Sequence, residues 1–421
     1  GYNTAVGHEA GNSVSTGVQN TLIGGLAGHQ LTTGQDNVAV GYAALTSDDV
    51  GNRTTAIGRF AGYNQNYTGS TNSNNVYVGY YAGANVSTGV DNTFIGTEAG
   101  SNINTANSNT FIGTSAGQFA TTSAQSTFIG RRAGLGVDGT PLTGNNHVCV
   151  GFQAGQNLRG TTTNNTFVGV DAGVSVTTGA NNTFIGTLAG DGTDDGAGNV
   201  AIGQGTLSAN CGDDNCAVGT NALELCTGTN NTGLGTAAGA GVTSGINNMV
   251  LGHDAGRTGS PGGNITTGNN IIALGDENIG VCHIQTDWTI ASDQRDKTDF
   301  TALDVGLDFV KALNPVTYKW DKRSKYGDKT VDDYDLDAQT PDGTHKEDWL
   351  DVGFKAQEVE VLEKAAGYKI ADKTNLVTSL SDDGKQYGMQ YSKFVPILVK
   401  ALQELSAKND ALEARIATLE G

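Results

Sequence analysis

The chain places a serine hydroxyl and a lysine amine five residues apart, at Ser292 and Lys297. A serine becomes an effective nucleophile only when a neighbouring base removes its proton, and a neutral lysine can act as that base. Because lysine titrates near about 10.4 in water, it must be desolvated or lie beside positive charge to act near neutrality. Arg295 could supply that charge or be structural, whereas Asp293 and Asp296 would oppose the shift. The spacing alone is a weak indication of catalysis.

These residues stand at an abrupt change of composition. The chain before Ser292 has no lysine, 18 acidic residues and 6 arginines, and residues 292–421 have 25 acidic and 18 basic residues. The two parts therefore carry net charges of about −12 and −7, which repel nucleic acid and anionic membrane surfaces. No apolar run approaches the roughly 20 residues that span a bilayer. We expect two or more domains, no nucleic-acid partner and no membrane insertion.

Residues 1–280 repeat one motif sixteen times, mostly every 16 to 18 residues. A clean copy, Asn-Thr-Phe-Ile-Gly-Thr-Ser-Ala-Gly, runs from Asn109 to Gly117. Strands this short cannot bury themselves, but stacked copies share a core, so the period predicts a parallel β-solenoid or β-roll rod of about 16 rungs. The chain starts at Gly1 inside a copy, and we therefore expect it to be the C-terminal part of a longer protein. The anchor glycines are Gly7, Gly24, Gly41, Gly58, Gly79, Gly96, Gly113, Gly130, Gly151, Gly169, Gly186, Gly203, Gly219, Gly235, Gly252 and Gly275.

Each repeat position predicts a direction for its side chain. The residue before the anchor glycine is Ile, Val or Leu in all sixteen copies, and the residue two earlier is mostly Thr or Val. Because these two positions share a strand face, we expect Ile95, Ile112 and Ile129 to stack inside the core. The position between them would then face outward and form a subunit interface near a threefold axis. Its aromatic members are Phe94, Phe111, Phe128, Phe167 and Phe184.

Asparagine opens twelve of the sixteen copies, which predicts either an amide ladder between rungs or a turn residue with positive φ. Longer connections at residues 64–75, 136–146, 191–198 and 259–270 are the loops expected to carry recognition. The acidic pairs in these turns lack the ligand spacing of a calcium loop. The five cysteines, odd in number and without a Cys-x-x-Cys pair, are interpreted as apolar fillers at Cys149 and Cys216. We predict no metal site and no cofactor.

The last 130 residues predict a small α+β domain. Residues 280–290 read as a final strand anchored by Trp288, followed by a helix over 301–313 and a strand over 316–320. An acidic loop over 321–348 precedes a short helix near Val359, a strand over 386–390 and a long helix over 393–420. Its heptad seam favours oligomerisation over a single helix packed on its own domain. We expect the oligomer to be a homotrimer. The seam residues are Leu398, Leu402, Leu405, Asn409, Leu412, Ile416 and Leu419.

Four ordered blocks in this region resemble the self-cleaving intramolecular chaperone domain of phage tail fibres and tail spikes. Ser292, Asp293, Arg295 and Lys297 match its opening signature. Residues 313–320 match its Leu-x-Pro…Tyr segment, residues 353–359 its Gly-Phe-x-Ala-Gln-Glu-Val block, and residues 391–393 the Tyr-Ser-Lys start of its final helix. Phe300 stands where the family usually has an aliphatic residue, and the acidic loop is long. The repeats resemble the β-roll heads of trimeric adhesins and the shafts of phage fibres.

The resemblance implies that Ser292 is the nucleophile, Lys297 its base, and Ala291–Ser292 the bond that is cut once, in cis. Asp293 and Arg295 would support them. It divides the chain into a shaft at 1–280, a connection at 281–291 and a chaperone at 292–421. It implies a virion tail fibre, made in the host cytoplasm, whose partners are other tail proteins and a cell-surface receptor, a glycan or an outer-surface protein. The alternatives are a polysaccharide-degrading tail spike and a bacterial trimeric adhesin.

Overall fold

The computed structural model describes residues 1–285, 288–329, 331 and 333–420. The chain forms two compact units. The first comprises Gly1–Ala255 and Thr266–Leu274, and the second comprises Gly256–Ile265 and the chain from Gly275 on. The predicted domain boundaries at residues 280 and 291 stay a prediction.

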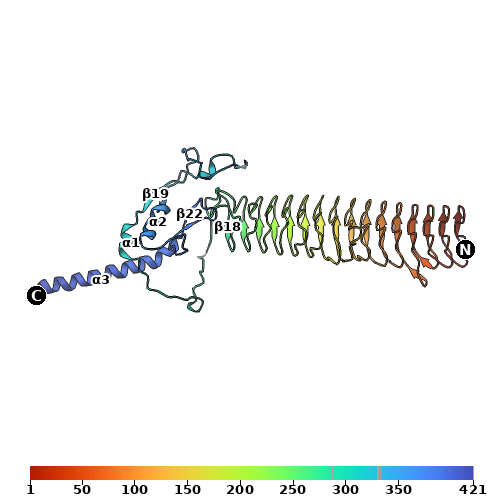
Figure 1. Ribbon diagram of the computed structural model, residues 1–421, viewed down its shortest axis with the longest axis horizontal. Coiled ribbons are helices and arrows are strands. Elements are labelled where there is room, and N and C mark those ends of the chain that lie inside the picture. The colour runs from red at the N-terminus through yellow and green to blue at the C-terminus, as the bar shows by residue number, and fades with distance from the viewer. Residues whose placement is uncertain (286–287, 330, 332, 421) are drawn as a thin grey trace. The chain divides into compact units, whose positions relative to one another are not determined.

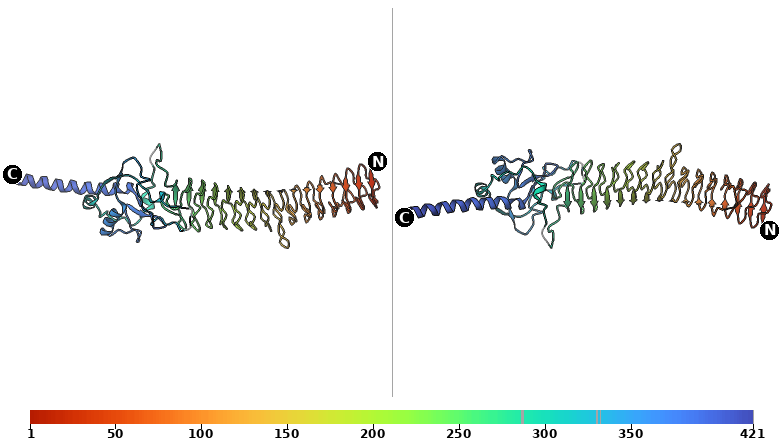
Figure 2. Two further views of the ribbon diagram at one scale, coloured as in Figure 1. Left: turned by 90° about the horizontal axis from the view of Figure 1, so that it is seen from above. Right: turned by 90° about the horizontal axis from the view of Figure 1, so that it is seen from below.

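The first unit is a parallel β-solenoid of about 15 turns, as the repeat predicts. One three-residue strand from each rung pairs in register with the next rung to make a single sheet of sixteen strands. Figures 1 and 2 show these strands as a stack of short arrows. They are β1 (Thr4–Val6), β2 (Thr21–Ile23), β3 (Val38–Val40), β5 (Thr55–Ile57), β7 (Val76–Val78), β8 (Thr93–Ile95), β9 (Thr110–Ile112), β10 (Thr127–Ile129), β11 (Val148–Val150), β12 (Thr166–Val168), β13 (Thr183–Ile185), β14 (Val200–Ile202), β15 (Cys216–Val218), β16 (Thr232–Leu234), β17 (Met249–Leu251) and β18 (Ile272–Leu274).

The anchor glycine is required where one rung lies on the next. Gly113, directly after β9, has φ +138°, and a Cβ on it would overlap the carbonyl of Gly130 in the following rung. A side chain there would therefore both strain the backbone and push the rungs apart. In the connection between β3 and β7, two short segments, β4 (Gly51–Asn52) and β6 (Thr71–Asn72), form a separate two-stranded parallel sheet.

The predicted direction of the strand side chains is wrong. The middle residue of each strand points inward: Phe94, Phe111 and Phe128 are fully buried and stack ring on ring at 4.9 and 4.6 Å between centroids. Ile95 and Ile129 do form one column with Ile112, but this column lies on the outer face, where Ile95 is 37% exposed. A strand that is apolar on both faces does not reveal from its alternation which face is buried, and the larger aromatic rings occupy the interior.

In several rungs a large interior residue is paired with a small one six positions away. Phe184 is followed six residues later by Gly190, at which a Cβ would overlap the phenyl ring. In three rungs the middle residue is instead alanine and the residue six positions later is leucine. These leucines are fully buried and have φ of 50° to 52°. The pairs are Ala39 with Leu45, Ala201 with Leu207, and Ala217 with Leu223.

The asparagines form the predicted ladder. The Asn92 amide nitrogen donates to the Ala106 carbonyl at 2.9 Å, and its Oδ1 accepts from the backbone N–H of Asn109 at 3.1 Å. The positive φ falls one residue earlier, at positions such as Ser108. The ladder thus gives each rung side-chain hydrogen bonds to its neighbour in a buried position.

His147 takes the place of asparagine in one rung and reproduces its bonds. Nε2 lies 2.9 Å from the Thr162 carbonyl, and the Asn165 backbone N–H donates to Nδ1 at 3.4 Å. These partners require the neutral ring with its proton on Nε2. Burial lowers the pKa of His147 to about 4, since the charged ring would lose its hydration.

A second irregularity places a carboxyl group inside the solenoid. Asp48 occupies an interior position filled in other rungs by residues such as Leu31 and Val86, and it is fully buried. Its Oδ2 accepts from Gln65 Nε2 at 2.7 Å, and Gln65 Oε1 accepts in turn from Tyr77 and Asn75. Burial raises the pKa of Asp48 to about 6.

The second unit has a small core of its own. Helix α1 (Leu307–Ala312) packs against α3 (Phe394–Glu420), and Glu404 of α3 accepts from the N–H of Leu307 at 2.8 Å. The other elements are η1 (Gln294–Asp296), β19 (Val316–Tyr318), η2 (Arg323–Lys325), β20 (Asp351–Gly353), α2 (Ala356–Ala365), β21 (Thr378–Leu380), β22 (Tyr387–Met389) and η3 (Tyr391–Lys393). The buried core residues are Val305, Phe309, Val359, Val377, Phe394 and Ile397.

These elements correct one prediction and add one strand. Residues 280–285 and 288–290 form no strand, and residues 286–287 of the predicted strand lie outside the described residues. Trp288 is 72% exposed and is therefore not the buried anchor that was predicted. Residues 280–290 lack the Asn-Thr-Phe-Ile-Gly motif that positions each strand on the preceding rung. Strand β21, which pairs antiparallel with β22, was not predicted from the sequence.

Candidate functional site

The turn around η1 brings the hydroxyl and the amine together. Asp293 caps this short helix, its side chain accepting from the Arg295 N–H at 2.9 Å, and the Lys297 N–H donates to the Gln294 carbonyl at 3.2 Å. The chain therefore folds back over five residues. Lys297 Nζ lies 2.6 Å from Ser292 Oγ and 3.3 Å from the Ser292 carbonyl oxygen. This is the contact that a nucleophile and its base require.

The neighbouring charges form their own pair. The Arg295 guanidinium lies 2.6 Å from the Asp293 carboxylate. This partner holds the pKa of Asp293 below its usual range and raises the pKa of Arg295. Asp293 thereby has a structural role in the turn. Because the charge of Arg295 is compensated locally, it is a poor means of making Lys297 neutral.

All residues from Ser292 to Lys297 are exposed, and apolar side chains flank them on both sides. Ile290 is 72% exposed before the turn and Phe300 is 67% exposed after it. Exposed apolar residues beside such a turn indicate a surface that another element covers.

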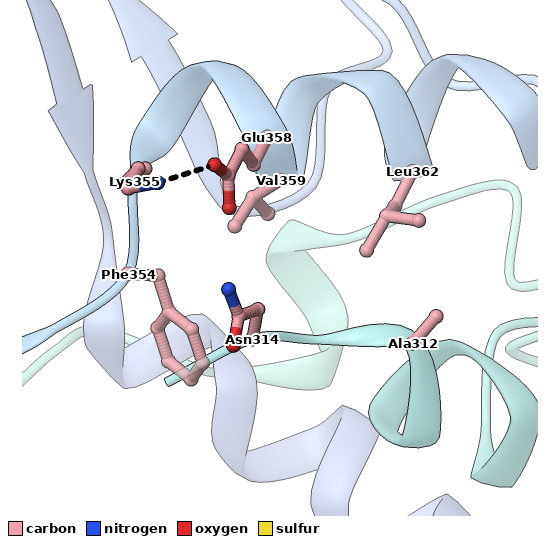
Figure 3. A pocket seen from close by; sticks show the side chains of 7 residues that line it. All are labelled: Ala312, Asn314, Phe354, Lys355, Glu358, Val359 and Leu362. Carbon is pink, nitrogen blue, oxygen red and sulfur yellow. Dashed lines mark hydrogen bonds and ion pairs between the residues drawn. The ribbon is translucent and has the colours of Figure 1, made fainter. Parts of the chain in front are cut away.

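A pocket of about 170 Å³ lies elsewhere in the second unit, between the end of α1 and the start of α2 (Figure 3). Figure 3 shows Phe354 and Asn314 on one side of it and Val359 and Leu362 on the other. Lys355 and Glu358 form an ion pair of 2.7 Å at its mouth. It holds neither Ser292 nor Lys297, and its size is below the range of small-molecule sites. The two sequence blocks that line it pack the domain together.

The predicted seam residues lie on one long helix, and all of them are exposed. The start of α3 is buried in the core of the unit through Phe394, Ile397 and Ala401. The seam itself is exposed, with Leu402 at 67% and Leu419 at 79% exposed. Asn409 bonds within the helix to Glu413 at 3.0 Å. Leu398, Leu405, Leu412 and Ile416 are also about half exposed.

The cysteines are free thiols: Cys149, Cys211 and Cys226 are buried, and Cys216 and Cys282 are exposed. Cys149 fills an interior position, although the middle position of the strand was predicted to face outward, and Cys216 lies on the outer face. Within the described residues, His, Cys, Asp and Glu form no group of three or more that could hold a metal ion. No helix among those described is long and apolar enough to cross a membrane.

Residues 292–368 match the sequence model of a peptidase family described as the chaperone of endosialidase. The match begins at Ser292 and includes three of the four sequence blocks, and it ends before Tyr391–Lys393. Neither the curated proteins nor the solved structures contain a match to the chain. The chain therefore carries a chaperone-of-endosialidase domain at its C-terminus after a β-solenoid, an organisation that fits a tail-fibre-like or tail-spike-like protein.

Proposed function

We propose that this chain is a phage tail fibre whose C-terminal domain aligns three copies, drives their folding and then cuts itself off between Ala291 and Ser292. The observation that carries the proposal is the 2.6 Å contact of Lys297 Nζ with Ser292 Oγ, at the residue where the family match begins. The solenoid is the mature fibre shaft. Its partners are a cell-surface receptor, a glycan or an outer-surface protein, and other tail proteins of the virion.

The cut proceeds through the serine hydroxyl. Neutral Lys297 takes the proton of Ser292 Oγ, and the oxygen adds to the carbonyl carbon of Ala291. The C–N bond breaks as the proton passes from Lys297 to the Ser292 nitrogen, which leaves an ester between Ala291 and the serine oxygen. Water then hydrolyses the ester. Ala291 ends as a carboxylate, and Ser292 regains its hydroxyl and has a free amino group.

Assembly would provide the desolvation of Lys297 that the separate chain lacks. The turn is exposed, and desolvation is the strongest means of making lysine neutral. Burial of Ile290 and Phe300 against neighbouring copies would remove water from Lys297. The half-exposed heptad residues of α3 provide the contact that brings these copies together. The chaperone therefore cuts after assembly, when its work on the shaft is complete.

Mass spectrometry of the intact protein tests this proposal. The wild-type chain should yield a fragment ending at Ala291 and one beginning at Ser292, whereas Ser292→Ala should stay whole. Lys297→Arg is the matched variant, because arginine keeps the positive charge but does not deprotonate. It should also stay whole. Cleavage that persists in Ser292→Ala would contradict the proposed nucleophile, and an uncut wild-type assembly would contradict self-cleavage.

A further inference from the structure

The outer face of the solenoid sheet carries a continuous uncovered apolar column. We define the outer strand face as the first and third residues of each of the sixteen strands of the large sheet. The third residue is Ile, Val or Leu in every strand, and it stays partly exposed, with Ile23 and Ile185 at 39% and Leu234 at 51%. Strand pairing keeps these residues in one row from rung to rung. An exposed position that is always aliphatic points to a covering surface.

This face also lacks charge. None of its thirty-two positions is Asp, Glu, Lys or Arg, although the chain has a net charge of −19 and 16% charged residues. The first residues of the strands are mostly Thr, with Val, Cys, Met or Ile in the others. A face exposed to water in the final assembly normally carries charged side chains. The residues of the outer strand face instead resemble the uncharged centre of a protein interface.

We propose that the outer strand face packs against the same face of further copies of this chain, side by side and parallel, along the length of the solenoid. The inference rests on the homotrimer of the proposed function and names the surface through which the shafts meet. The outer strand face thus takes the role that the sequence analysis gave to the phenylalanine positions, which lie inside each chain.

Two features favour a second copy of the chain as the occupant. The column has sixteen evenly repeated rungs, and another copy of the same solenoid has the same spacing along its whole length. The rest of the shaft sequence is acidic, so copies brought together elsewhere would repel each other, whereas this face has no like charges to oppose contact. The seam of α3 runs along one helix and also favours parallel copies.

Cys216 is a native cysteine on the outer strand face, so it can be used to test this contact by cross-linking. It is the first residue of β15, it is exposed, and its in-register neighbours are Val200 and Thr232. In parallel, aligned shafts the Cys216 thiols of two copies face each other. A short bis-maleimide links two such thiols by addition, without an oxidant. Cys282→Ser removes the other exposed thiol from the experiment.

The full-length Cys282→Ser chain should give covalent dimers with the short bis-maleimide. The matched control adds Cys216→Ser and Thr227→Cys, which moves the thiol to the exposed connection between β15 and β16. We expect at least about a tenfold lower yield of dimer from the control. Ile185→Glu with Ile202→Glu should lower the yield from Cys216 by a similar factor, since carboxylates would then lie in the contact. Hydrogen exchange of the shaft should show that this variant keeps its fold, because both isoleucines are partly exposed.

The outcomes separate this inference from the proposed function. An oligomer in sedimentation that gives no Cys216 cross-link and tolerates both glutamates would overturn the outer strand face as the contact and leave the trimer standing. A chain that sediments as a monomer at every concentration would overturn the trimer and this inference together. Equal cross-linking from Cys216 and Thr227→Cys would indicate collisions between shafts and would also overturn the inference.

Discussion

Volume compensation inside the solenoid predicts a pair of substitutions that each destabilise the shaft and together restore it. Leu207 is fully buried beside the alanine rung of β14, in the position that Gly190 occupies beside Phe184. Leu207→Gly with Ala201→Phe would convert this rung into the phenylalanine type. Strand pairing places residue 201 directly on Phe184, so the new ring would extend the existing stack of Phe167 and Phe184.

The single changes have opposite defects of similar size. Leu207→Gly leaves a cavity, and losses of buried leucine cost about 2 to 5 kcal/mol. Relief of the positive φ at Leu207, about 1 to 2 kcal/mol, is nearly balanced by the greater freedom of glycine in the unfolded chain. Ala201→Phe overfills the space that Leu207 already occupies, at about 1 to 3 kcal/mol. The double variant should lie within about 1 kcal/mol of the wild type, whereas the two single costs add to at least about 3 kcal/mol.

Hydrogen exchange read by mass spectrometry is the suitable assay, because an array of rungs can open locally without a single unfolding transition. Peptides covering β13 to β15 should exchange about 100-fold faster in Leu207→Gly, which corresponds to about 3 kcal/mol. Protection should return in the double variant, while peptides from β2 and β3 serve as the internal control. A double variant as exchange-labile as the sum of the two single ones would refute the idea that these positions share one volume.

Three further outcomes follow from the buried and exposed residues of the chain. The pKa of His147 is about 4 in the folded chain and 6.5 in the unfolded chain. The neutral ring therefore stabilises the shaft fully above pH 6.5, and this contribution of about 3 kcal/mol is lost as pH falls toward 4. His147→Asn should remove that loss in urea unfolding at pH 7 and pH 4.5. The pKa of Asp48 is about 6 in the folded chain and 3.8 in the unfolded chain, so the folded chain binds the proton more tightly. The free energy of unfolding therefore falls by about 3 kcal/mol as pH rises from 3.8 to 6. Asp48→Asn should therefore stabilise the shaft at pH 7, and an unchanged pH profile would contradict the burial of this carboxyl. Leu405→Asp with Leu412→Asp should yield misassembled or insoluble shafts on sedimentation, because both residues lie on the exposed seam of α3, and normal trimers from this variant would count against the chaperone role.

The solenoid could be predicted from the repeat because each rung needs the same residues at the same positions to pack on the next rung. Gly113 must pass close to Gly130, and Asn92 must bond to the next rung, so both residues recur with the period of the fold. The predicted direction of the strand side chains was wrong for a physical reason: Phe111 and Ile112 are both apolar, and alternation defines two faces without showing which one is buried. The pairing of Phe184 with Gly190 and of Ala201 with Leu207 is the signal that could have decided it.

The site was predicted in part. The family resemblance assigned Ser292 and Lys297 as nucleophile and base, roles that require a contact, and the turn brings the two groups to 2.6 Å. Whether the pair is catalytic stays a prediction. The direction of Arg295 could not be inferred, because the choice between Lys297 and the Asp293 carboxylate depends on the geometry of the short η1 turn. Strand β21 was missed because three residues in a polar segment give too short a pattern.

Because the rungs are nearly identical, most of the shaft cannot define how two solenoids are aligned along their length. If two aligned solenoids slide by one rung, fifteen of their sixteen strands still meet an equivalent strand, so the lateral contact barely distinguishes the two alignments. The rungs with long connections differ, since the pair β4 and β6 and the segment Gly136–Leu142 occur at one height each. These irregular connections mark specific positions along an otherwise regular solenoid. Copying regular rungs would lengthen the solenoid and leave these irregular connections unchanged, whereas deleting an irregular rung would remove one feature that distinguishes the two alignments.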